Sequence, residues 1–165
     1  MAPDFVRVAI TMPSGHVAVM SFVTREYTPS GEVRWEREPT AGAIESEIGR
    51  TIVGPVAGWR LIDEADIPAD RYFRNAWKDT GAKLDVDMPK AREIHREHLR
   101  ARRAPLLAAL DTEYMRADEA ADVPEKRRIA AKKQALRDVT ADPRIDAATT
   151  PEALKAVVPA ALTGG

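Results

Sequence analysis

The sequence predicts an α+β protein in which a small antiparallel β-meander is followed by a long C-terminal α-helical hairpin. Apolar residues alternate with polar ones over residues 5–38, which is typical of half-buried strands. Over residues 87–139 they recur instead at helical spacing. We therefore expect a small β-rich domain with short helices over residues 1–80, and a helical hairpin with a short C-terminal helix over residues 87–159.

Three strands are expected in the first part of the chain, over residues 5–10, 17–23 and 32–37. Val33 and Trp35 of the third strand are expected to point inward. Turn chemistry separates the strands, because proline presets φ and glycine accepts a positive φ. These turns are Pro13-Ser14-Gly15 and Pro29-Ser30-Gly31.

Shorter elements are expected between the meander and the hairpin. Residues 41–48 predict a helix that buries Ile44 and Ile48 and ends at Gly49. Residues 59–62 predict a short strand, and residues 71–77 a short helix with Phe73 and Trp77 on one side. The large aromatic side chains are expected in the small core; they are Trp35, Trp59, Phe73 and Trp77.

The hairpin is predicted from its caps as well as its periodicity. Asp87 suits the start of the first helix, and Asp122 followed by Pro124 suits the start of the second. The turn is expected near residues 118–123. Pro105 inside the first helix predicts a kink or a break. A last helical turn is expected after Thr150, and residues 163–165 are expected to be loose.

Composition excludes some classes of function. Lys plus Arg total 25 against 26 for Asp plus Glu, so the net charge of −1 gives no general attraction to nucleic acid or to an anionic membrane. No stretch approaches the roughly 20 apolar residues needed to cross a bilayer. The chain has no cysteine, and its N-terminus lacks the pattern of a signal peptide. We expect neither a membrane nor a nucleic acid as partner.

Two alternatives concern the charged residues of the predicted hairpin. His95 and His98, three residues apart, are a candidate metal pair, but zinc proteases need histidines four apart; surface or interhelical histidines explain them better. The basic residues offer contacts for nucleic-acid phosphates. Interspersed acidic residues favour ion pairs on solvated faces instead. The basic residues are Arg92, Arg96, Arg100, Arg102 and Arg103, then Lys126, Arg127, Arg128, Lys132, Lys133 and Arg137.

Catalytic motifs are missing from the sequence. It contains no Gly-x-Ser-x-Gly and no glycine loop with phosphate-binding spacing. The carboxylates of Asp63, Glu64 and Asp66 suit the start of a helix. We therefore expect no enzymatic activity, no cofactor, no metal and no small-molecule substrate.

The apolar stripe of the hairpin predicts a protein interface. A lone hairpin covers the centre of each stripe and leaves the flanks exposed, and exposed apolar flanks on a charged helix mark binding surfaces. The arginines would form the rim of such an interface. The candidate partner-binding residues are Phe73, Trp77, Leu99, Leu106, Leu107, Leu110 and Tyr114.

Several segments carry a family resemblance. They are Leu99-Arg100-Ala101-Arg102-Arg103-Ala104-Pro105-Leu106-Leu107-Ala108-Ala109-Leu110-Asp111, Gln134-Ala135-Leu136-Arg137-Asp138, Thr150-Pro151-Glu152-Ala153-Leu154 and Arg71-Tyr72-Phe73-Arg74-Asn75-Ala76-Trp77. Together they resemble small tail-region proteins of tailed bacteriophages and prophages, some of which are called phage tail assembly chaperones or tail fibre assembly proteins.

The resemblance implies a non-enzymatic structural protein of the phage tail, at the tip, the baseplate or the fibre attachment. Its partners would be other phage tail proteins or further copies of itself. Its location would be the virion tail, after synthesis in the host cytoplasm. The alternative is a tail fibre assembly chaperone that binds a fibre protein and is absent from the virion. The sequence leaves open which of the two holds, which protein is the partner, and the oligomeric state.

Overall fold

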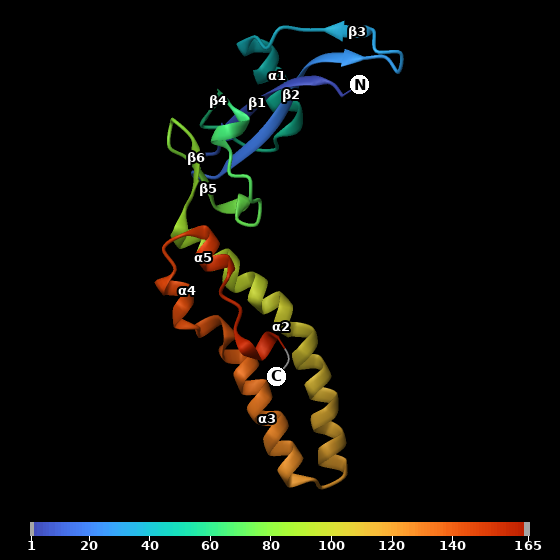
Figure 1. Ribbon diagram of the computed structural model, residues 1–165, viewed down its shortest axis with the longest axis vertical. Helices are drawn as coiled ribbons and strands as arrows, with labels where there is room; N and C mark the ends of the chain where they lie inside the picture. The colour runs from blue at the N-terminus through green and yellow to red at the C-terminus, as the bar shows by residue number, and fades with distance from the viewer. Residues whose placement is uncertain (1, 164–165) are drawn as a thin grey trace. The chain divides into compact units, whose positions relative to one another are not determined.

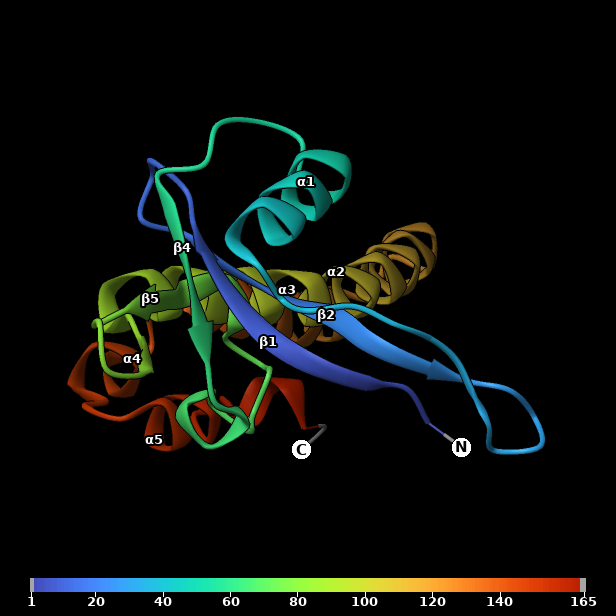
Figure 2. The same cartoon turned by 90° about the horizontal axis from the view of Figure 1, so that it is seen from above.

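The computed structural model describes residues 2–163 and confirms the α+β class. The chain divides into two compact units, Met1–Asp87 and Met88–Gly165. The first unit is built on an antiparallel sheet and the second is helical (Figures 1 and 2).

The sheet of the first unit contains the expected three-stranded meander. Its strands are β1 (Asp4–Thr11), β2 (Val17–Tyr27) and β3 (Val33–Glu36). Gly15 and Gly31 have φ of 76° and 88°, so both turns use glycine where a side chain would be strained. The expected short strand is β4 (Gly58–Ile62), which pairs with β1 and gives the antiparallel order β3-β2-β1-β4.

One face of the sheet packs against the helix α1 (Ala41–Thr51), as Figure 2 shows. The buried cluster between them contains Val8, Ile10, Phe22, Ile44 and Ile48. The predicted core positions of α1 are confirmed. Its predicted end at Gly49 is wrong: the helix continues to Thr51, and Ile52 is the first extended residue. Gly49 does not adopt the positive φ that would stop a helix.

The inward orientation expected for Val33 is also wrong, since its side chain is 52% exposed. The register shifts between Glu26 and Tyr27 of β2, so that Tyr27 pairs with Val33 and Arg34 is an extra residue on β3. A register shift in a strand changes which side chains face the core. Trp35 is half-buried, and its indole nitrogen donates to Glu26.

The short helix expected over residues 71–77 is wrong. A 3₁₀ turn, η2 (Arg74–Ala76), leads directly into β5 (Trp77–Asp79), which pairs with β6 (Leu84–Val86). An earlier 3₁₀ turn is η1 (Glu64–Asp66). The Arg60 guanidinium donates to both carboxylate oxygens of Asp79 at 2.9 Å, which ties β5 to β4. Phe73 and Trp77 are nevertheless buried, as expected for core aromatics.

The second unit begins with the predicted hairpin, α2 (Met88–Glu119) followed by α3 (Val123–Asp138). The Asp122 side chain accepts a hydrogen bond from the Glu125 N–H and so caps α3 as expected. The turn includes Ala121, whose φ of 51° is left-handed. α2 continues through Pro105, so the alternative of a helix break is wrong. The carbonyl of Ala101 loses its donor, but Ala101 is exposed and water can replace it.

Short helical segments complete the second unit. The Thr150 side chain caps one of them by accepting from the Ala153 N–H, as predicted. Thr163 donates through its hydroxyl to the Ala160 carbonyl; Gly164 and Gly165, also expected to be loose, lie outside the described residues. The segments are η3 (Val139–Ala141), α4 (Pro143–Ala147), α5 (Pro151–Lys155) and η4 (Ala160–Leu162).

Candidate protein-binding groove

The antiparallel helices α2 and α3 lie side by side (Figure 1). We call the two sides of their contact its seams. Ile129 and Leu136 of α3 and Leu99 and Ala117 of α2 are buried and form the centre of the hairpin core. Two helices alone cannot enclose an apolar core, so each seam must be closed by long side chains, by other segments or by a partner.

One seam is closed by charged side chains, and we call it the closed seam. Tyr114 of α2 lies against two lysines of α3, with the Lys126 and Lys133 nitrogens 5.4 and 5.2 Å from its ring centroid. Lys126 pairs with Asp118, and Lys133 pairs with Asp111. The Lys133 side chain is only 16% exposed, because its aliphatic part covers the apolar surface. The chain therefore covers this seam itself.

The other side of the hairpin holds a groove of about 480 Å³, which we call the open seam. Ala109 and Ala135 stand on its walls beside Glu113 and Lys132, and Leu106 remains accessible in the groove. The short C-terminal segment borders the groove. Its lining residues are Leu106, Ala109, Leu110 and Glu113 of α2, Lys132, Ala135 and Leu136 of α3, and Ala161, Leu162 and Thr163.

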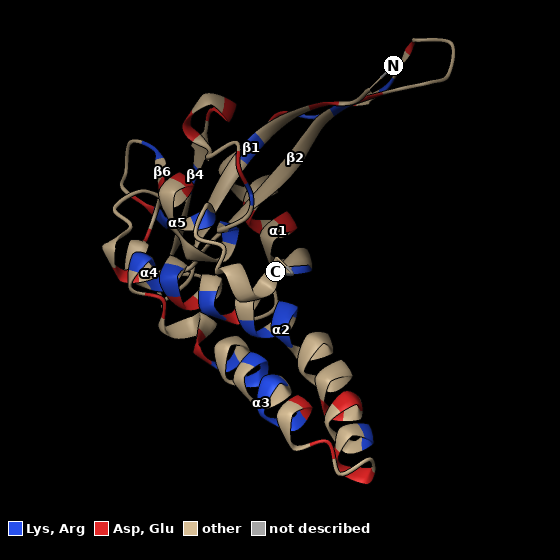
Figure 3. Cartoon of the chain, turned by 60° about the horizontal axis from the view of Figure 1, so that its bottom comes forward, with Lys and Arg blue, Asp and Glu red and all other residues tan. Residues whose placement is uncertain are grey.

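A run of uncharged apolar residues lies in the middle of α2, over residues 104–110, and we call it the apolar band. Figure 3 shows it as an uncharged stretch of α2 between charged ones. The run spans about two turns, so apolar side chains point to all sides of the helix. α3 covers one side only: Leu106 remains 40% exposed, and Ala108 and Ala109 are exposed. A helix that is apolar on all sides is normally buried on all sides.

The structure distributes the seven candidate partner-binding residues over different environments. Leu106 and Leu110 line the open seam. Tyr114 belongs to the closed seam, and Leu107, seven residues earlier, follows the same side of α2. The other three are buried within their own units, so they can contribute to a partner site only by supporting it; they are Phe73, Trp77 and Leu99.

The sequence did not indicate that the small and charged members of the open seam belong to a protein-binding site. Ala109, Ala135 and Ala161 look like ordinary helix formers in the sequence. Glu113 and Lys132 look like ordinary surface charges. Only the side-by-side placement of α2 and α3 shows that they line one groove.

His95 occupies a structural position in the second unit. Its side chain is 1% exposed, and its Nε2 donates to the Val157 carbonyl at 2.9 Å, which ties α2 to the segment after α5. Burial lowers the pKa of His95, while the bond to Val157 opposes this shift. Within the described residues no group of three histidine, cysteine, aspartate or glutamate side chains is placed to hold a metal ion.

Several arginines of α2 hold the C-terminal segments by hydrogen bonds to main-chain carbonyls. Arg103 donates to the Arg137 carbonyl at 2.7 Å, at the end of α3. Arg92 donates to the Ala148 carbonyl at 2.9 Å, after α4. Cationic side chains stabilise the free carbonyls at helix C-termini. Arg96 pairs with Asp146 at 2.7 Å. Part of the basic character of α2 thus serves the fold of its own unit.

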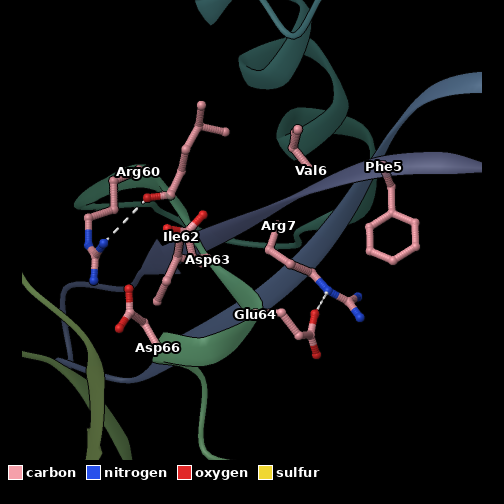
Figure 4. A pocket seen from close by; sticks show the side chains of 9 residues that line it. Phe5, Val6, Arg7, Arg60, Ile62, Asp63, Glu64 and Asp66 are labelled. Atoms are coloured by element: carbon pink, nitrogen blue, oxygen red, sulfur yellow. Dashed lines mark hydrogen bonds and ion pairs between the residues drawn. The ribbon is translucent and has the colours of Figure 1, made fainter.

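A second hollow of about 500 Å³ lies in the first unit, where β4 ends beside β1 (Figure 4). Both arginines that line it have partners: Arg7 pairs with Glu64 at 2.6 Å, and Arg60 pairs with Asp79 outside the hollow. Among the described residues that line it, none carries a hydroxyl, thiol or imidazole group. They are Phe5, Val6, Arg7, Arg60, Leu61, Ile62, Asp63, Glu64 and Asp66.

Comparison with family models, with curated proteins and with solved structures finds no match for this chain. None of the helices within residues 2–163 combines the length and the apolar character needed to span a membrane.

Proposed function

We propose that this chain is a non-enzymatic structural protein of a bacteriophage tail, at the tip, the baseplate or the fibre attachment, and that it acts by binding other proteins through its helical hairpin. The observation that carries the binding role is the apolar band beside the open seam, whose leucines no other part of the described chain covers fully. Exposed contiguous apolar surface on a charged protein marks an interface.

The viral setting of the proposal is supported by the sequence resemblance to tail-region proteins. The same groove also suits the second candidate, a tail fibre assembly chaperone, because it is already formed in the free chain and needs no rearrangement to accept a client. The two candidates differ in whether the protein stays in the finished particle.

Quantitative mass spectrometry of purified particles and of the producing lysate tests the proposal. A fixed number of copies per particle supports the structural role. Presence in the lysate in complex with a fibre protein, together with absence from particles, supports the chaperone. A chain that associates with no tail protein in either sample contradicts both.

A double variant tests whether incorporation into particles depends on the open seam. Replacing Leu106 and Leu110 by serine removes apolar floor from the open seam, and we expect incorporation to fall at least tenfold. Replacing Ala130, which is exposed on α3 and lies outside both the groove and the apolar band, by serine is the matched control. Circular dichroism of each variant checks that the hairpin remains folded.

A further inference from the structure

The identity of the occupant follows from the backbone groups at the open seam. Its walls are α2 and α3, whose N–H and C=O groups are paired within the helices. An extended peptide on this apolar floor would leave its own backbone groups without partners, which costs free energy for each buried group. A helix satisfies its backbone internally. The groove therefore favours a helix over a strand.

The dimensions and side chains of the groove also suit a helix. Leu106 and Glu113 mark its extent along α2, roughly 11 Å or two helical turns. Ala109 on one wall and Ala135 on the other leave room for a third backbone to approach, and packed helices lie about 8–10 Å apart. A partner would present apolar residues at i, i+3 or i+4, and i+7 to the leucines of the floor.

Two charges at the groove define the polar side of the occupant. Glu113 lies on the α2 wall and Lys132 on the α3 wall. Within residues 2–163 neither forms an ion pair, whereas Asp111 and Lys133 of the closed seam pair with each other. A complementary helix would carry a carboxylate toward Lys132 and a basic group toward Glu113. Such charges fix the orientation of a partner more than they add affinity.

A second copy of this chain is a poor occupant. A two-fold pair formed through this surface would place the same groove against itself. In such a pair one hollow faces another, because α2 and α3 are the walls of both grooves and neither copy presents a separate helix to fill the other. Shape thus favours a different protein.

We propose that the open seam binds one amphipathic α-helix of another protein, which completes a three-helix bundle with α2 and α3. This inference rests on the proposed function, because it names the partner element of the same surface. It defines the partner chemistry: apolar residues at helical spacing, flanked by an acidic residue on the α3 side and a basic residue on the α2 side.

Site-specific photocrosslinking in cells that produce the chain from its own genomic locus tests the inference. A photoreactive amino acid replaces Ala109 or Ala135 in the groove. Ala130, which is exposed and lies at helical spacing from Lys126 and Lys133 on the closed side, is the matched control. Mass spectrometry then identifies the partner residues that each position reaches.

The expected result is crosslinks from Ala109 and Ala135, and not from Ala130, to residues of one partner spaced three or four apart. Partner residues spaced two apart would indicate a strand and overturn the inference. So would peptides of a second copy of this chain, equal crosslinking from Ala130, or no crosslink from the groove.

A charge reversal provides a second readout. Lys132→Glu should lower the crosslinking yield from Ala135 about tenfold by opposing the partner carboxylate. Arg127→Glu, an exposed position that does not line the groove, should leave the yield unchanged.

The composition of purified particles distinguishes failure of the partner-helix inference from failure of the proposed tail function. Tail incorporation without helix-spaced crosslinks refutes the helix alone, while helix-spaced crosslinks to a protein unrelated to tails refute the proposed function alone.

Discussion

Leu106 and Leu136 occupy equivalent places in the apolar pattern of the hairpin but differ in burial. Leu136 is 3% exposed, whereas Leu106 is 40% exposed at the open seam. We therefore expect Leu136→Ala to lower the free energy of unfolding by about 2–5 kcal/mol, because it leaves a cavity. Leu106→Ala should cost about 1 kcal/mol or less in the isolated chain.

Urea unfolding followed by circular dichroism measures both changes. Equal losses for the two variants would mean that Leu106 is covered within the chain, and the open seam would then be closed in solution. In a complex Leu106→Ala should have the larger effect on binding, because a leucine buried by the partner becomes important for binding.

His95 makes the stability of the second unit depend on pH. Burial lowers its pKa below the ordinary value of 6.5, so the unfolded chain takes up the proton first as pH falls. The free energy of unfolding should therefore be constant above about pH 6.5 and decrease from there toward the folded-state pKa. Arg96, Arg102 and His98 add positive charge nearby and act in the same direction.

Unfolding experiments between about pH 7.5 and pH 5.5 give the slope, which His95→Gln should reduce. The comparison of slopes remains valid even if the variant is less stable at every pH. An unchanged slope in His95→Gln would contradict the assignment.

The end of α3 depends on a side chain of α2. The Arg103 guanidinium donates to the Arg137 carbonyl at 2.7 Å, where the helix has no N–H donor left to offer. We expect Arg103→Ala to lower the free energy of unfolding by about 1–2 kcal/mol. Arg100→Ala should change it by no more than about 0.5 kcal/mol, since Arg100 only pairs with Glu97 on an exposed face.

Thermal unfolding of the two arginine variants provides the comparison. The two substitutions remove the same side chain from the same helix, so helix propensity cancels between them. A larger loss for Arg100→Ala would show that the contact with the α3 carbonyl does not stabilise the hairpin.

Elements that are bounded by capping residues or turn residues could be predicted from the sequence. Asp122 and Pro124 start α3, and Pro-Ser-Gly turns separate the strands, because capping and turn formation involve residues close in the chain. Residues 71–77 could not be predicted in this way. Phe73 and Trp77 have helical spacing, but Trp77 begins the strand β5. Asp79 of β5 pairs with Arg60 of β4, which is distant in the sequence.

The apolar residues of the candidate site could be predicted from the sequence, but which side of the hairpin remains open could not. The stripe that includes Leu106 and Leu110 identifies the face of α2 that meets α3. Which seam is closed depends on how α2 and α3 are aligned against each other. The spacing of apolar residues in the sequence does not determine that alignment. Only after Lys133 is placed beside Asp111 and Tyr114 is it clear that the opposite side remains open.

At the scale of the whole molecule, stability should be unevenly distributed along the hairpin. The first part of α2 packs against α5 and η3 as well as α3, and His95 and Arg92 add hydrogen bonds there. Toward the turn, the main neighbour of α2 is α3. Local opening requires less free energy where fewer apolar contacts must break.

Hydrogen exchange with mass spectrometry should therefore show protection that decreases along α2 from residues 91–99 toward the turn at residues 118–122. Peptides from β1, which has a neighbouring strand on each side, are the internal reference for strong protection. Pro105 adds a local effect, since it removes one helical hydrogen bond.

A bound partner helix should raise protection over residues 104–113 and 132–136 and leave β1 unchanged, because ligand binding stabilises the segments that it contacts. Uniform protection along free α2 would mean that the far end of the hairpin is as stable as its base, and that the open seam needs no partner to complete it.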